Sequence, residues 1–435
     1  METKRLKILF VLLLSTSIFI MYLKYQQYEI TKQRELELNN SLELIKSDLQ
    51  TYKLEYNLTH PLYLDQKVNK KDIDVAISRA LLLRNKLIHL NVSKDEIDDI
   101  DRCLNETYTL KNRGEFSDAL AQGRVCAILA SDYLGSFLVI ANREEFIKYA
   151  SEELQNLTNL RSIVDRKWKE KLNEGVNFID YMILGFLVED KLIEAEIFLN
   201  SSSLSLKELQ KSPDPTMPEE IENTTLLGSR ITSDLEFARS FLEDALIFMN
   251  HVDGGDFKPD ELKEEVYTLK ENLSKADKPC TFPMAMVKVA CDWKDYHKKR
   301  SIIGIRDCYY SAATYHLLYA LAVAENLGEF ESLESAFNTA GSTMNRTKII
   351  IGLRHEALNS LNTCSSDQIT SLYIRDAVRW YFKRADFALR RAITLRIDNP
   401  TTQPLYDYEM AKILAQKMCP YISMTIIPGN LNRQR

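Results

Sequence analysis

The chain has 435 residues, with 62 acidic against 56 basic side chains and a net charge of −6. This balance lacks the basic field with which proteins bind nucleic acid, so we expect no nucleic-acid partner. Only 13 glycines and 11 prolines are present. Their scarcity argues against β-rich folds and glycine-rich phosphate loops, because both depend on glycine at their turns.

The N-terminus is typical of a membrane anchor. A basic cluster of Lys4, Arg5 and Lys7 precedes an uncharged apolar run at residues 8–23. As a helix this run is about 24 Å long, which is short for a bilayer core, but the flanking lysines can reach the interface. The positive-inside rule then places the N-terminus in the cytoplasm and the rest of the chain outside. We expect residues 1–28 to be an uncleaved, single-pass anchor.

Two other interpretations of this segment stay open. A signal peptide could be cleaved near Ser15–Ser17, but cleavage there would leave the apolar residues 18–23 exposed at the new N-terminus. The run could also be a buried helix of the domain itself. We favour the anchor over both.

Asn-x-Ser/Thr sequons support export independently. A random order of these residues would give about three sequons, whereas the chain has nine. Since glycans attach only on the exported side, the excess predicts an extracellular glycoprotein. The candidate sites are Asn39, Asn57, Asn91, Asn105, Asn156, Asn200, Asn223, Asn272 and Asn345.

Residues 29–58 carry a heptad pattern next to the expected membrane segment. Apolar and tyrosine side chains recur there at alternating spacings of four and three, from Leu38 to Tyr56. This pattern predicts either a weak homodimer through residues 38–56 or an amphipathic helix packed on its own domain. We favour the second interpretation.

The rest of the chain is predicted to be all-α. Apolar stripes at helical spacing occur in residues 72–90, 115–134 and 144–157, and capping boxes at Ser233/Glu236 and Ser365/Gln368 predict the starts of two further helices. Three prolines within residues 213–218 predict a break. We therefore expect an N-terminal lobe at residues 59–211, a linker at 212–226 and a C-terminal lobe at 227–435.

Several of these helices resemble tetratricopeptide units. The second helix of that motif begins with glycine and an aromatic residue at fixed spacing from later small and aromatic residues. Three segments fit in part: Gly328, Phe330, Phe337 and Ala340; Gly114, Phe116 and Ala119; Asp190, Leu192, Ala195 and Leu199. The regular 34-residue period is missing. The resemblance implies stacked antiparallel helical hairpins, an α-solenoid-like domain behind one transmembrane helix.

Cysteines and histidines give few candidate sites. Cys103 and Cys126 lie at similar distances from the turn signal at residues 112–114, so a helical hairpin could join them in a disulfide, with two free thiols as the alternative. A nucleophile built from Cys291 and His297 is disfavoured, since residues six apart point away from each other on a helix. We expect His316 to be a core histidine inside a buried helix at 309–324. No motif predicts a catalytic residue, a metal site or a cofactor.

A basic stripe forms the strongest charge feature. Arg375, Arg379, Lys383 and Arg390 lie near one another in a predicted helix and form a candidate docking face, although a solvated face paired with acids is the favoured interpretation.

The anchor, the sequons and the helical architecture together predict a membrane-anchored extracellular scaffold that binds an unknown protein partner. The alternatives are an enzyme or enzyme subunit with an unrecognised active site, and a structural component of the cell envelope.

Overall fold

The computed structural model describes residues 68–280, 284–341, 343–363 and 402–425, together with six positions from Tyr381 to Leu389. These residues form helices, apart from short turns and two isolated β-bridges of Val176 with Gly254 and Phe257. The all-α prediction is thus confirmed for the described part of the chain. The expected anchor, the heptad segment and the sequons at Asn39 and Asn57 lie outside it.

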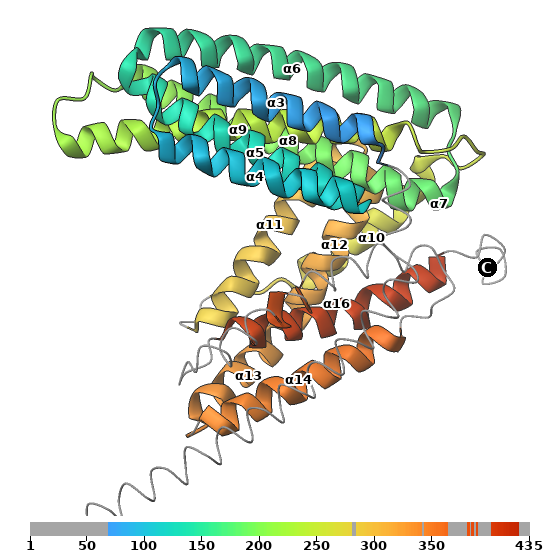
Figure 1. Ribbon diagram of the computed structural model, residues 1–435. Helices are drawn as coiled ribbons and strands as arrows, with labels where there is room; N and C mark the ends of the chain where they lie inside the picture. The colour runs from blue at the N-terminus through green and yellow to red at the C-terminus, as the bar shows by residue number, and fades with distance from the viewer. Residues whose placement is uncertain are drawn as a thin grey trace, which may run out of the picture.

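A first bundle contains six long helices. They are α3 (Lys70–His89), α4 (Lys94–Arg113), α5 (Phe116–Ala141), α6 (Arg143–Glu174), α8 (Phe186–Lys211) and α9 (Pro218–Met249). Figure 1 shows them running side by side. α5 lies at the centre of this bundle, since it packs against α3, α4 and α9. A short helix α7 (Phe178–Asp180) and a π-helical turn η1 (Tyr181–Gly185) lead into α8.

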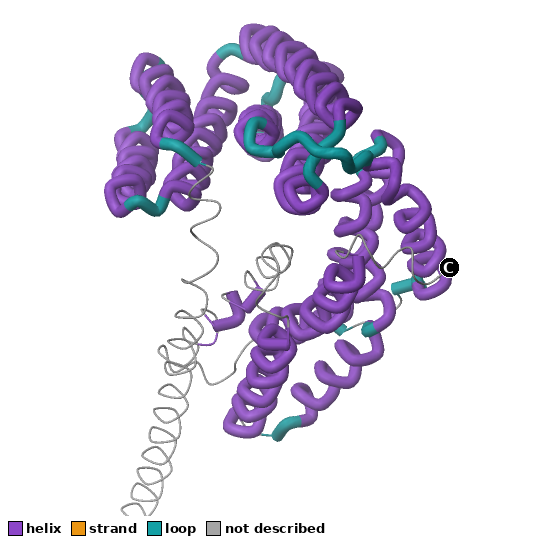
Figure 2. Tube along the Cα trace, turned by 90° about the vertical axis from the view of Figure 1, so that its right-hand side faces the viewer, coloured by secondary structure: helices purple, strands orange, loops and turns teal. Residues whose placement is uncertain are grey.

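A second bundle follows in the sequence. It contains the short η2 (Pro259–Leu262) and α10 (Lys263–Ala276), α11 (Ala285–Asp307), α12 (Tyr310–Glu325), α13 (Leu327–Thr339), α14 (Thr343–Thr363) and α16 (Gln403–Thr425). α12 is its central helix and packs against α10, α11 and α16, while α14 pairs with α16. Seen from the side, the helices of both bundles succeed one another along an arc (Figure 2).

Local chemistry sets the ends of the helices. Asn69 caps α3 by accepting hydrogen bonds from the backbone N–H groups of Lys71 and Asp72, and Ser93 with Glu96 forms a capping box at α4. Gly114 ends α4 with a φ of 80°, a left-handed conformation that glycine adopts without steric cost. These signals are local in sequence, which is why the predicted bounds of α3 differ from the observed ones by only one or two residues.

The proline-rich segment at 212–226 has a different structure from the expected linker. α9 already begins at Pro218, where a proline is favoured because the first helical N–H has no intrahelical partner. α8 and α9 then pack along each other as an antiparallel hairpin. Residues 212–217 are the turn of this hairpin, and the core runs on from α8 and α9 into the second bundle.

The expected helix start at Ser233 is a correction. Ser233 lies inside α9, and its hydroxyl donates a hydrogen bond across to Asp132 on α5. Glu236 is buried and forms an ion pair with Arg79 on α3. Both side chains therefore bind groups on neighbouring helices. In a capping box they would instead bind the free backbone N–H groups at the start of their own helix.

Two apolar helices are core helices. Within the described residues, α5 is long and apolar enough to cross a membrane. It lies between α3, α4 and α9, and its buried Arg124 forms ion pairs with Glu243 and Asp244 on α9. α12 is buried on nearly all sides, as the sequence predicts for residues 309–324.

Candidate functional site

The two bundles meet at a group of buried polar side chains. We call this group the joint and define it by Glu189 and Asp190 on α8, Tyr181 on η1, His297 and Arg300 on α11, and His316 on α12. Burying a polar or charged side chain costs free energy unless it finds hydrogen-bond partners. Each polar group of the joint therefore needs partners inside the protein.

Glu189 is fully buried and links α8 to the N-terminus of α12. Its Oε2 accepts a hydrogen bond from the Ala312 backbone N–H at 3.0 Å, and its Oε1 accepts one from the Tyr181 hydroxyl at 2.9 Å. Trp168 Nε1 lies 3.4 Å from the same Oε1. Burial raises the pKa of the Glu189 carboxyl to about 8, although these donors act in the opposite direction. Glu189 is thus mostly protonated at neutral pH.

The π-helical turn before α8 makes room for this arrangement. A side chain at Gly185 would approach Tyr181 Cδ2 to 2.7 Å and Trp168 Cζ2 to 3.3 Å. The glycine therefore allows both aromatic rings to lie against the turn, with their donor groups directed at Glu189. π-helical turns are rare, and they occur frequently at functional sites.

Asp190, the next residue, is held in the opposite protonation state. Arg300 NH1 lies 3.3 Å from its Oδ1, and His316 Nε2 lies 3.1 Å from the same oxygen. Burial alone would raise the pKa of Asp190, but the charge of Arg300 and the hydrogen bond from His316 hold it well below its usual value. Arg300 also forms an ion pair with Glu194 one turn along α8. Of these two adjacent carboxyl groups, Glu189 is thus protonated and Asp190 is ionised.

The two histidines of the joint share one proton between their facing nitrogens. His297 Nδ1 lies 2.8 Å from His316 Nδ1. Because His316 donates through Nε2 to the ionised Asp190, its Nδ1 accepts when the ring is neutral, and His297 Nδ1 donates. Protonating both facing nitrogens would place two N–H groups against each other. Burial lowers the pKa of both rings, and the neighbouring His316 lowers that of His297 further.

Aromatic side chains enclose the pair. The ring of His297 stacks on Tyr319, with centroids 3.6 Å apart and planes inclined by 16°. The Tyr319 hydroxyl hydrogen-bonds to that of Tyr381, and burial raises the pKa of Tyr381 to about 12. The Asp190 carboxylate and the two imidazoles form a hydrogen-bonded row that can hold or move a proton. Tyr319 meets this row through ring stacking on His297, and Asp190, at the other end, is 14% exposed.

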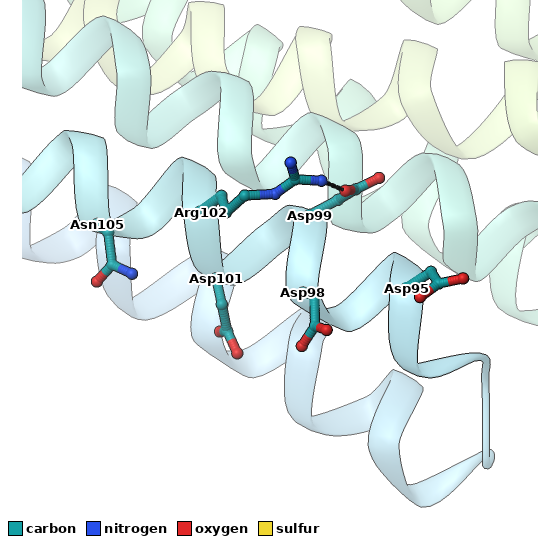
Figure 3. A pocket seen from close by; sticks show the side chains of 6 residues that line it. All are labelled: Asp95, Asp98, Asp99, Asp101, Arg102 and Asn105. Atoms are coloured by element: carbon teal, nitrogen blue, oxygen red, sulfur yellow. Dashed lines mark hydrogen bonds and ion pairs between the residues drawn. The ribbon is translucent and has the colours of Figure 1, made fainter.

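A surface hollow lies away from the joint, along α4 (Figure 3). It has a volume of about 510 Å³ and is lined by Asp95, Asp98, Asp99, Asp101, Arg102 and Asn105. All six residues belong to one helix, and Arg102 pairs with Asp99. The hollow is thus an open, acidic helix surface. Among the described residues, no group of three His, Cys, Asp or Glu side chains is arranged to hold a metal ion.

Cys103 and Cys126 are joined across the α4–α5 hairpin, with an S–S distance of 2.09 Å and Cα atoms 5.6 Å apart. A second disulfide, which the sequence did not suggest, joins Cys280 to Cys291 on α11. Because its sulfur is bonded, Cys291 cannot be the thiolate of a nucleophile. This excludes the disfavoured pairing of Cys291 with His297.

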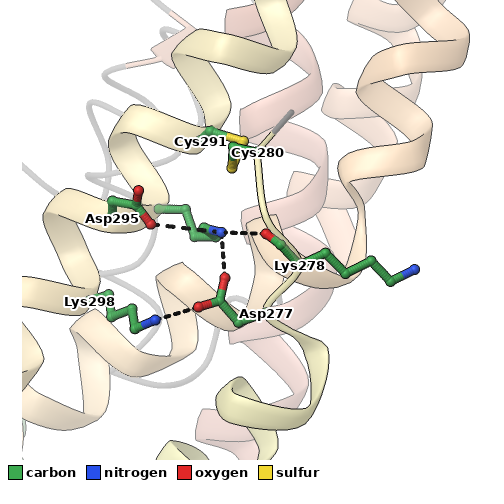
Figure 4. The surroundings of a disulfide bond; sticks show 7 residues. Asp277, Lys278, Cys280, Cys291, Asp295 and Lys298 are labelled. Atoms are coloured by element: carbon green, nitrogen blue, oxygen red, sulfur yellow. Dashed lines mark hydrogen bonds and ion pairs between the residues drawn. A yellow bond between two sulfur atoms is a disulfide. The ribbon is translucent and has the colours of Figure 1, made fainter. Parts of the chain in front are cut away.

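The second disulfide belongs to a clamp between the end of α10 and α11 (Figure 4). Asp277 forms ion pairs with Lys294 and Lys298, and the buried Lys294 Nζ also donates to the Lys278 carbonyl at 3.2 Å. Burial acts to raise the pKa of Asp277, but the hydrogen bonds from the two lysines lower it overall. The clamp fixes the segment that leads into α11.

The structure separates the remaining candidate residues into two groups. Every sequon asparagine within the described residues is exposed: Asn91, Asn105, Asn156, Asn200, Asn223, Asn272 and Asn345. The candidate docking face of Arg375, Arg379, Lys383 and Arg390 lies outside the described residues. Its neighbour Arg384 forms an ion pair with the buried Asp407.

Comparison with known proteins adds no assignment. No protein-family model, curated protein or solved structure matches the chain.

Proposed function

We propose that the protein is a membrane-anchored, exported α-helical scaffold that works by binding another protein. The observation that carries this proposal is the pair of disulfides, together with the exposed sequon asparagines. Disulfides persist in oxidising compartments and are rare in the cytosol, and the apolar run at residues 8–23 supplies the expected anchor. Location and anchoring thus have independent support from cysteine chemistry and from the sequence of the N-terminus.

The arc of helices supports a binding role. Helical hairpins that stack along a curved path, as in tetratricopeptide-like solenoids, present extended faces that suit protein ligands. In the α8–α9 hairpin, Leu204 and Leu226 are 68% and 61% exposed. These two leucines are the positions at which we place a contact with another protein.

The location is tested by expressing the full chain in a host that exports and glycosylates proteins. We expect a membrane-retained species that resists carbonate washing and loses mass on deglycosylation. A matched variant with Leu14→Arg and Phe19→Arg breaks the apolar run and should lose membrane retention. A soluble, unmodified chain that begins at Met1 would contradict the proposal.

The binding role is tested on the cell surface. A photo-crosslinking amino acid at position 204 should give a discrete crosslinked product, and the same group at the exposed Glu264 on α10, in the second bundle, should not. Equal products from both positions, or none, would contradict a specific protein ligand.

An enzymatic function is the second candidate, and the joint is the observation that favours it. A carboxylate, two imidazoles and a protonated carboxyl group side by side resemble an acid–base arrangement. However, these groups are enclosed by helices, whereas the hollow on α4 is open and distant from them. A binding scaffold needs no reactive groups in a cleft, so we favour it.

A further inference from the structure

The sequon at Asn105 is divided between the surface and the core. The Asn105 side chain is exposed on α4 (Figure 3). Two residues on, Thr107 is fully buried, and its hydroxyl donates to the Cys103 carbonyl at 3.1 Å. The same hydroxyl lies 3.5 Å from Cys126 Sγ. The hydroxyl of this sequon is therefore packed against one sulfur of the disulfide that joins α4 to α5.

N-glycosylation requires both side chains of a sequon at once. The asparagine amide nitrogen attacks C1 of a lipid-linked sugar phosphate. The N–C1 bond forms, the C1–O bond to the phosphate breaks, the lipid phosphate leaves with the electron pair, and the amide nitrogen loses one proton. The transferase recognises the Ser/Thr hydroxyl on the extended sequon. In folded α4 the sequon is helical and the Thr107 hydroxyl is covered, so transfer to Asn105 has to precede folding of this hairpin.

We propose that Asn105 is glycosylated only before the Cys103–Cys126 disulfide closes, so that the two reactions compete on the newly exported chain. This inference rests on the proposed export. Closing the disulfide removes two protons and two electrons from the thiols, which an exported disulfide-exchange partner accepts. The two cysteines are 23 residues apart and the sequon lies between them, so closure traps any unmodified sequon inside the hairpin.

The folded hairpin accommodates the glycan once it is attached. The Asn105 side chain points to solvent, and Tyr108, one turn along the same face of α4, is 41% exposed. A sugar on Asn105 can therefore lie over the Tyr108 ring without displacing a core residue. Modified and unmodified chains fold alike, and the competition leaves two populations of the same protein.

Two other sequons separate the effect of the disulfide from that of folding. At Asn200 the hydroxyl of Ser202 is also buried and donates to the Ile231 carbonyl at 3.3 Å, but neither described disulfide joins α8 to another helix. At Asn156 the hydroxyl of Thr158 lies on an exposed residue of α6. Asn200 therefore reports on burial of the hydroxyl alone, and Asn156 reports on export and transferase activity.

The test is site-specific mass spectrometry on the full chain from an exporting, glycosylating host, with wild type compared with Cys126→Ser. This substitution leaves the residues that flank Asn105 in the sequence unchanged. We expect incomplete occupancy at Asn105 in wild type and a rise of about twofold or more in the variant, with the occupancies at Asn200 and Asn156 unchanged. Total chains are analysed, including any that fail to fold, and Cys103→Ser should give the same result.

Three outcomes would overturn the inference. Full occupancy of Asn105 in wild type, or no rise in either cysteine variant while Asn156 carries a glycan, would show that the disulfide does not compete. An equal rise at Asn105 and Asn200 would show that slower folding, rather than the missing disulfide, is responsible. Absence of glycan from all sequons would contradict the export on which the inference rests.

Discussion

Replacing Glu189 by glutamine tests the electrostatics of the joint most directly. The pKa of Glu189 is raised from 4.5 to about 8 in the folded protein. A carboxyl group with a raised folded pKa contributes fully to stability below its unfolded pKa, and this contribution is lost as the pH rises through the folded pKa. At ~1.4 kcal/mol per pH unit, the interval corresponds to a loss of up to about 5 kcal/mol. Glutamine has a similar shape but does not titrate.

The assay is urea unfolding of wild type and E189Q between about pH 5 and pH 8. The other groups titrate in both proteins, so the difference in unfolding free energy isolates Glu189. We expect E189Q to be least stable relative to wild type at the acid end and to gain ~1.4 kcal/mol per pH unit on wild type toward pH 8. A difference that stays constant with pH would mean that the Tyr181, Trp168 and Ala312 donors keep Glu189 ionised.

Two further substitutions test packing and crosslinking. Gly135→Ala would place Cβ 2.0 Å from Thr232 Oγ1 where α5 crosses α9, and we expect a loss of about 1–3 kcal/mol by thermal unfolding; Gly328→Ala, where nothing lies within 4 Å, should be neutral or slightly stabilising. Cys280→Ser removes the Cys280–Cys291 disulfide, and we expect it to lower the free energy of unfolding in denaturant by about 3 kcal/mol.

The features that the sequence predicted are local. Helix stripes, the left-handed Gly114 and the spacing of Cys103 and Cys126 about that turn all act over one helix or one hairpin. The start of α9 was misplaced because a proline at the first helical position was interpreted as part of a linker. Ser233 was misplaced because a helical serine that bonds to a neighbouring helix has the same local pattern as a cap.

The joint could not be predicted from local patterns, because its contacts are long-range. Asp190 and His316 are 126 residues apart in sequence, and Glu189 and Ala312 are 123 apart. One signal was available. His297 and His316 lie on either side of the turn between α11 and α12 at Cys308, so an antiparallel hairpin brings them to similar heights. The same reasoning suggested the Cys103–Cys126 pair.

Acid should act on the joint before it acts on either bundle. Cys103–Cys126 lies within the first bundle and Cys280–Cys291 within the second, whereas α8 is held against α11 and α12 by the continuous apolar core and by the polar side chains of the joint. The groups that face the two histidines are Asp190 and Glu194 on α8, Tyr296 and Arg300 on α11, Tyr315 and Tyr319 on α12, and Tyr381. The phenols stay neutral and Arg300 stays charged over the acidic range, so the histidines and Glu189 decide the response.

The direction of that response follows from the pKa shifts. His297 and His316 have lowered pKa values in the closed joint, so their contribution to stability is present above about pH 6.5 and is lost as the pH falls below it. Glu189, whose pKa is raised, acts in the opposite direction, so the loss of stability on acidification is larger in E189Q than in wild type. Energy transfer between dyes on the exposed Gln155 of α6 and Ser332 of α13 should therefore report a change of distance between about pH 7.5 and pH 5. We expect this change to occur at a higher pH in E189Q than in wild type, while the helical circular dichroism stays constant in both. A constant distance in both proteins, or a change only when helix is lost, would show that the joint does not respond separately from the bundles.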